Sequence, residues 1–105
     1  MNEHFSFFDD APSRDELEHA IDHLFSGYTK SVCQSVLKVA DTLKEFTAED
    51  VRAWCEPPAG QENTFSAAML DAKRIGIIKV TGYQNATRKE AKGRVIPIYT
   101  RGFKP

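Results

Sequence analysis

Apolar residues recur at helical spacing in two stretches near the start of the chain. The first stretch follows Ser13, and Glu16 three residues later completes a capping-box pattern, which is typical of a helix N-terminus. Gly27 closes this helix, and Thr29 or Ser31 opens the second. The positions that predict the two buried faces are Leu17, Ala20, Ile21, Leu24 and Phe25 in the first helix, and Val32, Val36, Leu37, Ala40 and Leu43 in the second.

Two further helices are predicted on either side of a proline-rich turn. Thr47, with an aspartate three residues later, is the expected N-cap of the third helix, and the prolines of the turn at 57–62 end that helix. Asn63 or Thr64 caps the fourth helix, and Gly76 stands where a C-terminal cap is expected. The predicted inward positions are Val51, Trp54 and Cys55 in the third helix, and Phe65, Ala68, Met69 and Ala72 in the fourth.

After the fourth helix the pattern changes to one that favours strands. Residues 77–83 and 94–100 are rich in β-formers and predict an antiparallel hairpin with a polar, basic loop over 84–93. The segment 44–47 is long enough for only a single β-bridge. Pro97 lies inside the second strand and has no amide donor, so its nitrogen is expected past the end of that short segment or at a bulge.

Composition places the chain among folded domains. Its 105 residues are 41% hydrophobic and 28% charged, which supports one domain with an ordinary core. Disorder of the whole chain, a low-complexity fibre and a disulfide-stapled miniprotein are excluded. We therefore expect an α+β fold with an N-terminal arm at 1–12, an acidic helical extension at 13–30, a main domain at 31–101 and a tail at 102–105.

The sequence carries no sign of a membrane or secretory segment. No apolar run approaches the roughly 18–20 residues that span a bilayer, and the polar start lacks the apolar stretch of a signal peptide. Cys33 and Cys55 give neither a disulfide framework nor metal-ligand spacing. We expect a cytoplasmic protein with no membrane partner.

Charge is distributed unevenly along the chain, although the formal net charge is only −1. Residues 1–62 contain 5 basic and 13 acidic residues, a net charge of −8. Residues 63–105 contain 9 basic and 2 acidic residues, a net charge of +7. This asymmetry predicts that the C-terminal part meets a polyanion.

The sequence offers no arrangement typical of an enzyme. His19 and His23 have the spacing of metal ligands on one helix face, but no third ligand is indicated. The two cysteines and the aromatic residues Trp54 and Phe65 are assigned to the core. There is no nucleophile–histidine pair in the pattern and no glycine-rich phosphate loop. We expect no catalytic residue, no metal and no cofactor.

Three segments carry a family resemblance: FTAEDVR at 46–52, NTFSAAMLDAKRIGII at 63–78 and GRVIPIYTR at 93–101. Together, over about residues 31–101, the chain resembles a winged helix-turn-helix domain and, more narrowly, the small winged-helix domains of bacteriophage proteins. The resemblance implies a three-helix core and a C-terminal β-hairpin wing, to which this chain adds an extra N-terminal helix. It also implies a non-enzymatic regulator of transcription, or a replication or recombination accessory, that binds double-stranded DNA in the host cytoplasm.

The resemblance further implies that a recognition helix at 63–75 enters the major groove and that the basic wing at 84–94 contacts the backbone or the minor groove. Short polar side chains at the helix start and cations in the wing suit these contacts. Asp71 would repel phosphate unless it pairs with Lys73, Arg74 or a cytosine amino group. The predicted DNA-binding residues are Gln61, Asn63, Thr64, Ser66, Ala67, Lys73, Arg74, Gln84, Asn85, Thr87, Arg88, Lys89, Lys92 and Arg94.

Two questions stay open at the level of sequence. The chain could instead be a winged-helix protein-interaction module, such as a phage protein that binds or inhibits a host factor through its acidic N-terminal helix. The apolar stripe of that helix either covers the core of its own domain or meets the same stripe of a second copy in a homodimer.

Overall fold

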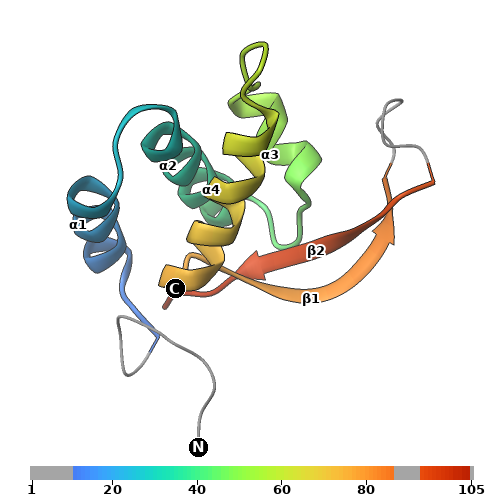
Figure 1. Cartoon of the computed structure of the whole chain (residues 1–105). Coiled ribbons are helices and arrows are strands. Elements are labelled where there is room, and N and C mark those ends of the chain that lie inside the picture. The colour runs from blue at the N-terminus through green and yellow to red at the C-terminus, as the bar shows by residue number, and fades with distance from the viewer. Residues whose placement is uncertain (1–10, 87–92, 105) are drawn as a thin grey trace, which may run out of the picture.

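The computed structural model describes residues 11–86 and 93–104, and within these ranges the chain forms four helices followed by one antiparallel hairpin (Figure 1). The elements are α1 (Arg14–Leu24), α2 (Gly27–Thr42), α3 (Ala48–Trp54), α4 (Glu62–Ile75), β1 (Ile78–Asn85) and β2 (Val95–Arg101). This arrangement confirms the predicted α+β class and is compatible with a winged helix. Among the described residues no helix is both long and apolar enough to cross a bilayer.

Three predicted helix ends are confirmed in atomic detail. Ser13 and Glu16 form a reciprocal capping box at the start of α1, and Thr47 and Asp50 form another at the start of α3. Gly76 ends α4 with a φ of 97°, a left-handed conformation that glycine adopts without a steric penalty. Side chains and backbone of these residues therefore satisfy amides and carbonyls that a helix end leaves without partners.

Two predicted helix starts are wrong by a few residues. α2 begins at Gly27, with Ser26 as N-cap, instead of at Thr29 or Ser31. The link to α1 is only two residues long, so Gly27 starts the second helix instead of closing the first, and the predicted boundary between residues 30 and 31 falls inside α2. α4 begins at Glu62, because the carbonyl of its N-cap Gln61 already accepts the amide of Phe65 at 3.0 Å.

The core lies around α2, which contacts every other helix and the second strand. All the predicted inward residues of α4 are buried, and so are Val32, Val36, Leu37 and Ala40 of α2. Leu24 and Leu43 were predicted to face inward but are 45% and 40% exposed. Leu24 is the last residue of α1 and Leu43 follows the last residue of α2, where the chain turns away from the core.

The prediction that Trp54 belongs to the core is wrong, because its side chain is 57% exposed. Residues on a helix are about 100° apart around its axis, so Ala48, Val51 and Cys55 fall within about 60° of one another on one side of α3. These three residues pack on the core. Trp54 is about 100° away from Cys55 and ends a helix of seven residues, so it points off the buried stripe.

The hairpin is anchored to the helices by the predicted single bridge between Phe46 and Tyr99. The amide of Tyr99 donates to the carbonyl of Phe46 at 2.7 Å, on the edge of β2 that faces away from β1. Amides alternate sides along a strand, so the nitrogen of Pro97 lies on the same edge, beyond the bridge, where no donor is required. One extra residue, Thr81, forms a bulge in β1 between Val80 and Gly82.

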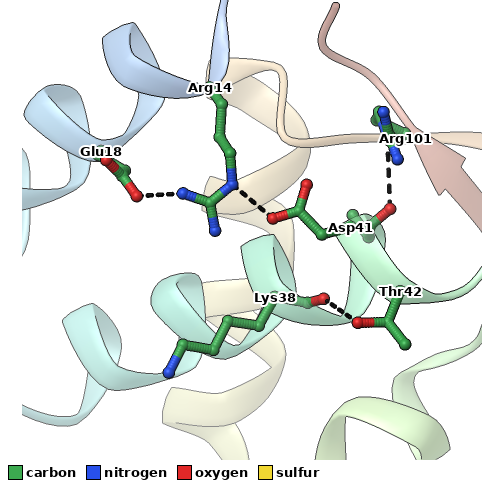
Figure 2. A network of polar contacts seen from close by, with 7 residues as sticks. Arg14, Glu18, Lys38, Asp41, Thr42 and Arg101 are labelled. Carbon is green, nitrogen blue, oxygen red and sulfur yellow. Dashed lines mark hydrogen bonds and ion pairs between the residues drawn. The ribbon is translucent and has the colours of Figure 1, made fainter. Parts of the chain in front are cut away.

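The extra helix α1 is fixed to the body of the protein. Leu17 and Ile21 are 0% and 1% exposed, so its apolar stripe covers the core of its own domain. At its start, the Arg14 guanidinium lies between the carboxylates of Glu18 and Asp41 (Figure 2). The hydrogen bond to Asp41 raises the pKa of the Arg14 side chain.

The two ends of the described chain are joined on the same side. The amide of Lys104 donates to the carbonyl of Pro12 at 2.9 Å, and the ring of Pro12 packs against Gly76 at the end of α4. In Figure 1, α1 and the loop end of the hairpin lie on opposite sides of the molecule, with α4 between them. The acidic helix is thus well separated from that end of the hairpin.

Candidate nucleic-acid interface

The outer face of α4 forms a ridge of side chains pointing away from the core. Asn63, Ala67, Leu70 and Arg74 recur at intervals of four, three and four residues, which places them within about 60° of one another around the helix axis. All four are exposed, and Leu70 is 55% exposed. The ridge therefore presents an amide, two apolar groups and a guanidinium in that order along the helix.

The start of α4 differs from the starts of α1 and α3 because Gln61 makes no side-chain cap. Gln61 and Thr64, both predicted to contact DNA, are half-buried, whereas Asn63 is exposed. Glu62, also exposed, puts a negative charge in the first turn. A phosphate approaching this helix end would meet free amides together with a repelling carboxylate.

A groove runs between α4, α3 and the hairpin. Its volume is about 290 Å³, and Ser66 and Leu70 of α4 line it together with Arg94 beside the hairpin. The remaining lining residues are Ala48, Glu49, Arg52, Phe65, Met69, Ala86, Ile96 and Tyr99. Its floor is thus largely apolar, while charged and polar groups stand along its sides. The groove brings together two regions that were predicted separately from the sequence, the fourth helix and the basic end of the hairpin.

The prediction that Gln84 and Asn85 lie in the loop is wrong, because both belong to β1. Gln84 is the cross-strand partner of Ile96, and Asn85 is the partner of Val95. Both side chains are exposed next to the groove, but neither lines it. The first strand extends further than the sequence suggested. Polar residues such as Gln84 and Asn85 have a low preference for strands, but pairing with β2 holds their backbone in the extended conformation.

Several of the basic residues are already engaged within the chain. The Arg74 guanidinium donates to the carboxylate of Asp71 at 3.0 Å, which is one of the pairings expected for Asp71. Arg101 donates to the carbonyl of Ala40 at 3.4 Å and stacks over the ring of Phe103 at 5.2 Å. Arg101 therefore supports the fold, and Arg74 carries a partly neutralised charge.

Lys73 of α4 and Arg94 beside the hairpin are exposed, and Arg94 lines the groove. Lys73 lies on the side of α4 that also carries Ser66, since the two residues are seven positions apart and about 20° apart around the axis. Thr87, Arg88, Lys89 and Lys92 were also predicted to contact DNA and lie outside the described residues. The described part of the wing thus contributes Gln84, Asn85 and Arg94.

Two residues at this surface were missed by sequence reasoning. Arg52 of α3 covers the ring of Phe65, with its guanidinium carbon 4.6 Å from the ring centre, and lines the groove. Leu70 had a signal in the sequence, because it lies about 100° from Met69 and therefore off the inward stripe of α4. An apolar residue off the buried stripe of a helix is a candidate contact residue.

The cysteines lie outside this surface. Cys33 is buried, as predicted, and burial raises the pKa of its thiol to about 12. Cys55 is half-buried, and its carbonyl accepts a hydrogen bond from the Tyr28 hydroxyl at 2.9 Å. Within residues 11–86 and 93–104, no three His, Cys, Asp or Glu side chains are grouped so that they could hold a metal ion.

Comparison of the chain with protein-family models, with curated proteins and with solved structures finds no match.

Proposed function

We propose that the chain is a winged-helix domain that binds double-stranded DNA and has no enzymatic activity. α4 enters the major groove, and the hairpin lies on the adjacent backbone. An α-helix fits the major groove of B-DNA, and its exposed side chains can reach base edges there. The three-helix core is α2, α3 and α4, with α1 as an added helix on the far side.

One observation carries this proposal: the groove residues Ser66 and Leu70 of α4 face the same space as Arg94 beside the hairpin. When a helix occupies the major groove, one phosphate strand passes along its flank. Here that strand would run over the groove, within reach of the Ser66 hydroxyl and the Arg94 guanidinium. Such contacts position a protein on a duplex without reading its sequence.

The charge of the described surface fits a moderate, salt-sensitive interaction. Lys73 and Arg94 are exposed and make no ion pair with another described residue. Each cation that neutralises a phosphate adds about 0.9 to the slope of log affinity against log salt concentration. The acidic α1 lies away from the loop end of the hairpin, where it would not oppose a duplex directly (Figure 1).

The proposal is tested by measuring fluorescence anisotropy of a labelled random-sequence duplex at several salt concentrations. Arg94→Gln should reduce the salt slope by about 0.9 and weaken binding about eightfold near 0.1 M salt, the contribution of one phosphate contact. Lys38→Gln is the matched control, because Lys38 is an exposed cation beside α1 in a different groove. Equal losses in the two variants, or no binding of any duplex at low salt, would contradict the proposal.

A second function is favoured by the exposure of Trp54. A tryptophan that is 57% exposed at a helix end is the type of residue that anchors protein interfaces. The second candidate is therefore a protein-interaction module that uses this end of α3, a different surface from the acidic N-terminal helix considered from the sequence. Capture of a defined partner that is lost in Trp54→Ala but retained in Arg94→Gln, together with absence of DNA binding, would favour it.

A homodimer through the N-terminal helix, the alternative left open by the sequence, would need a surface other than the apolar stripe of that helix. Leu17 and Ile21 of that stripe are already covered by the chain itself. A dimer through α1 would have to use its mainly acidic outer face, where two copies repel each other, or the exposed Leu24 at its end. Sedimentation of the full chain as a function of concentration measures this directly.

A further inference from the structure

We propose that the ridge of α4 reads the methyl groups of thymine, with Ala67 and Leu70 against the methyl groups and Asn63 beside them on adenine. This inference rests on the proposed DNA binding and names the class of duplex that the same surface prefers. Thymine is the one base that presents a methyl group in the major groove of unmodified DNA, and apolar side chains contact it there.

The position of Leu70 is the first reason. Its side chain is 55% exposed, although the helix already has a complete buried stripe in Phe65, Ala68, Met69 and Ala72. Leu70 therefore contributes little to the core. It stands near the middle of the helix on the side opposite the buried stripe, so it would face the base edges of a major groove that holds the helix.

The neighbours of Leu70 are the second reason. Ala67 precedes it on the ridge by three residues and is also exposed, so the centre of the ridge carries no hydrogen-bonding side chain. Such a surface bonds none of the donors and acceptors that either kind of base pair presents, but an A·T pair adds a methyl group that it can contact. The centre of the ridge therefore matches base pairs whose major-groove edge carries a methyl group.

The two ends of the ridge and its flank set the orientation. Asn63, at the N-terminal end, carries an amide that can bond both N6 and N7 of adenine, the base paired with thymine. Arg74, at the other end, is held by Asp71 at 3.0 Å, which leaves a nearly neutral pair next to the apolar centre. Lys73 and Arg94 stand on the side where phosphates would pass.

The combination of an apolar centre with cations beside it also restricts the partner. A hydrophobic protein surface would cover Leu70 but gain nothing from Lys73 and Arg94. A duplex rich in A·T pairs offers methyl groups in the groove, which match the apolar centre of the ridge, and phosphates along its edges, which match the two cations. An acidic protein with an apolar patch is the competing partner, and it becomes an outcome of the test.

The test compares two duplexes that differ only by the methyl group. Both contain about 20 base pairs, two turns of B-DNA, all of them A·T pairs in the same sequence. One carries thymine and the other uracil, and binding is measured by anisotropy. Wild-type protein should bind the thymine duplex about fourfold more tightly for each methyl group that is buried.

Leu70→Ala should lower affinity for the thymine duplex and abolish most of the difference between thymine and uracil. The variant is expected to fold, because the side chain is exposed and alanine favours helices, and circular dichroism checks this. Leu24→Ala, an exposed leucine of α1, is the matched control and should keep the full difference.

The outcomes separate this inference from the function on which it rests. Equal affinity of the wild type for both duplexes, with a loss in Arg94→Gln, would overturn methyl recognition and leave DNA binding intact. Equal loss of both duplexes in Leu70→Ala would also overturn it, since Leu70 would then act without recognising the methyl group. Failure of the wild type to bind either duplex would overturn both proposals and favour the protein partner.

Discussion

Replacing Leu17 with alanine should destabilise the entire domain, although Leu17 lies in α1, across the molecule from the loop end of the hairpin (Figure 1). Its side chain is 0% exposed and belongs to the same core cluster as the buried residues of α2 and α4. Truncation to alanine removes three carbon atoms, worth about 0.8 kcal/mol each when buried, and leaves a cavity. We expect a loss of about 3–5 kcal/mol in the free energy of unfolding.

A loss of this size is a large share of the roughly 5–15 kcal/mol that holds a typical domain together. Leu24→Ala is the matched control, because it makes the same chemical change in the same helix at a side chain that is 45% exposed. Its cost should stay below about 1 kcal/mol. Urea unfolding followed by circular dichroism at 222 nm, where helices dominate the signal, measures both variants. Equal, small losses would mean that α1 is not part of the cooperative core.

Two further predictions concern the core and the C-terminal segment. Gly102→Ala should cost about 1–3 kcal/mol, because a Cβ atom there would lie 2.7 Å from the carbonyl oxygen of Gly76, and thermal unfolding measures the loss. Above pH 9 an unfolded chain ionises Cys33 whereas the native thiol, with a pKa of about 12, keeps its proton, so stability should fall as pH rises through this range. Cys33→Ala should remove up to about 1.4 kcal/mol per pH unit of that fall, and an unchanged slope would contradict the burial argument.

Helix caps and apolar periodicity were predictable because they depend on residues close in sequence. Ser13 and Thr47 cap helices as predicted, and Gly76 ends α4. Pro97 was also placed correctly, because a missing amide excludes it from any paired edge. These features follow from local chemistry that no tertiary contact has to supply.

Features that depend on the rest of the chain were predicted less well. Trp54 was assigned to the core from its spacing. The short α3 buries Val51 against the core, and Trp54, at the edge of that buried face, stays exposed. Asn85 was assigned to the loop, although pairing with Val95 extends the strand to it. The meeting of Ser66 and Arg94 at one groove was not predictable, because it depends on the path of the hairpin after its bulge at Thr81.

The exposure of Trp54 has a practical consequence for spectroscopy. It is the one tryptophan of the chain, so the intrinsic emission has a single source at the end of α3. Because this indole is already largely in water, unfolding should shift its emission only slightly. A partner that covers the end of α3 would move the indole into a drier environment and shift the emission to the blue. Trp54 fluorescence should therefore report the binding of a partner at the end of α3 more strongly than it reports unfolding.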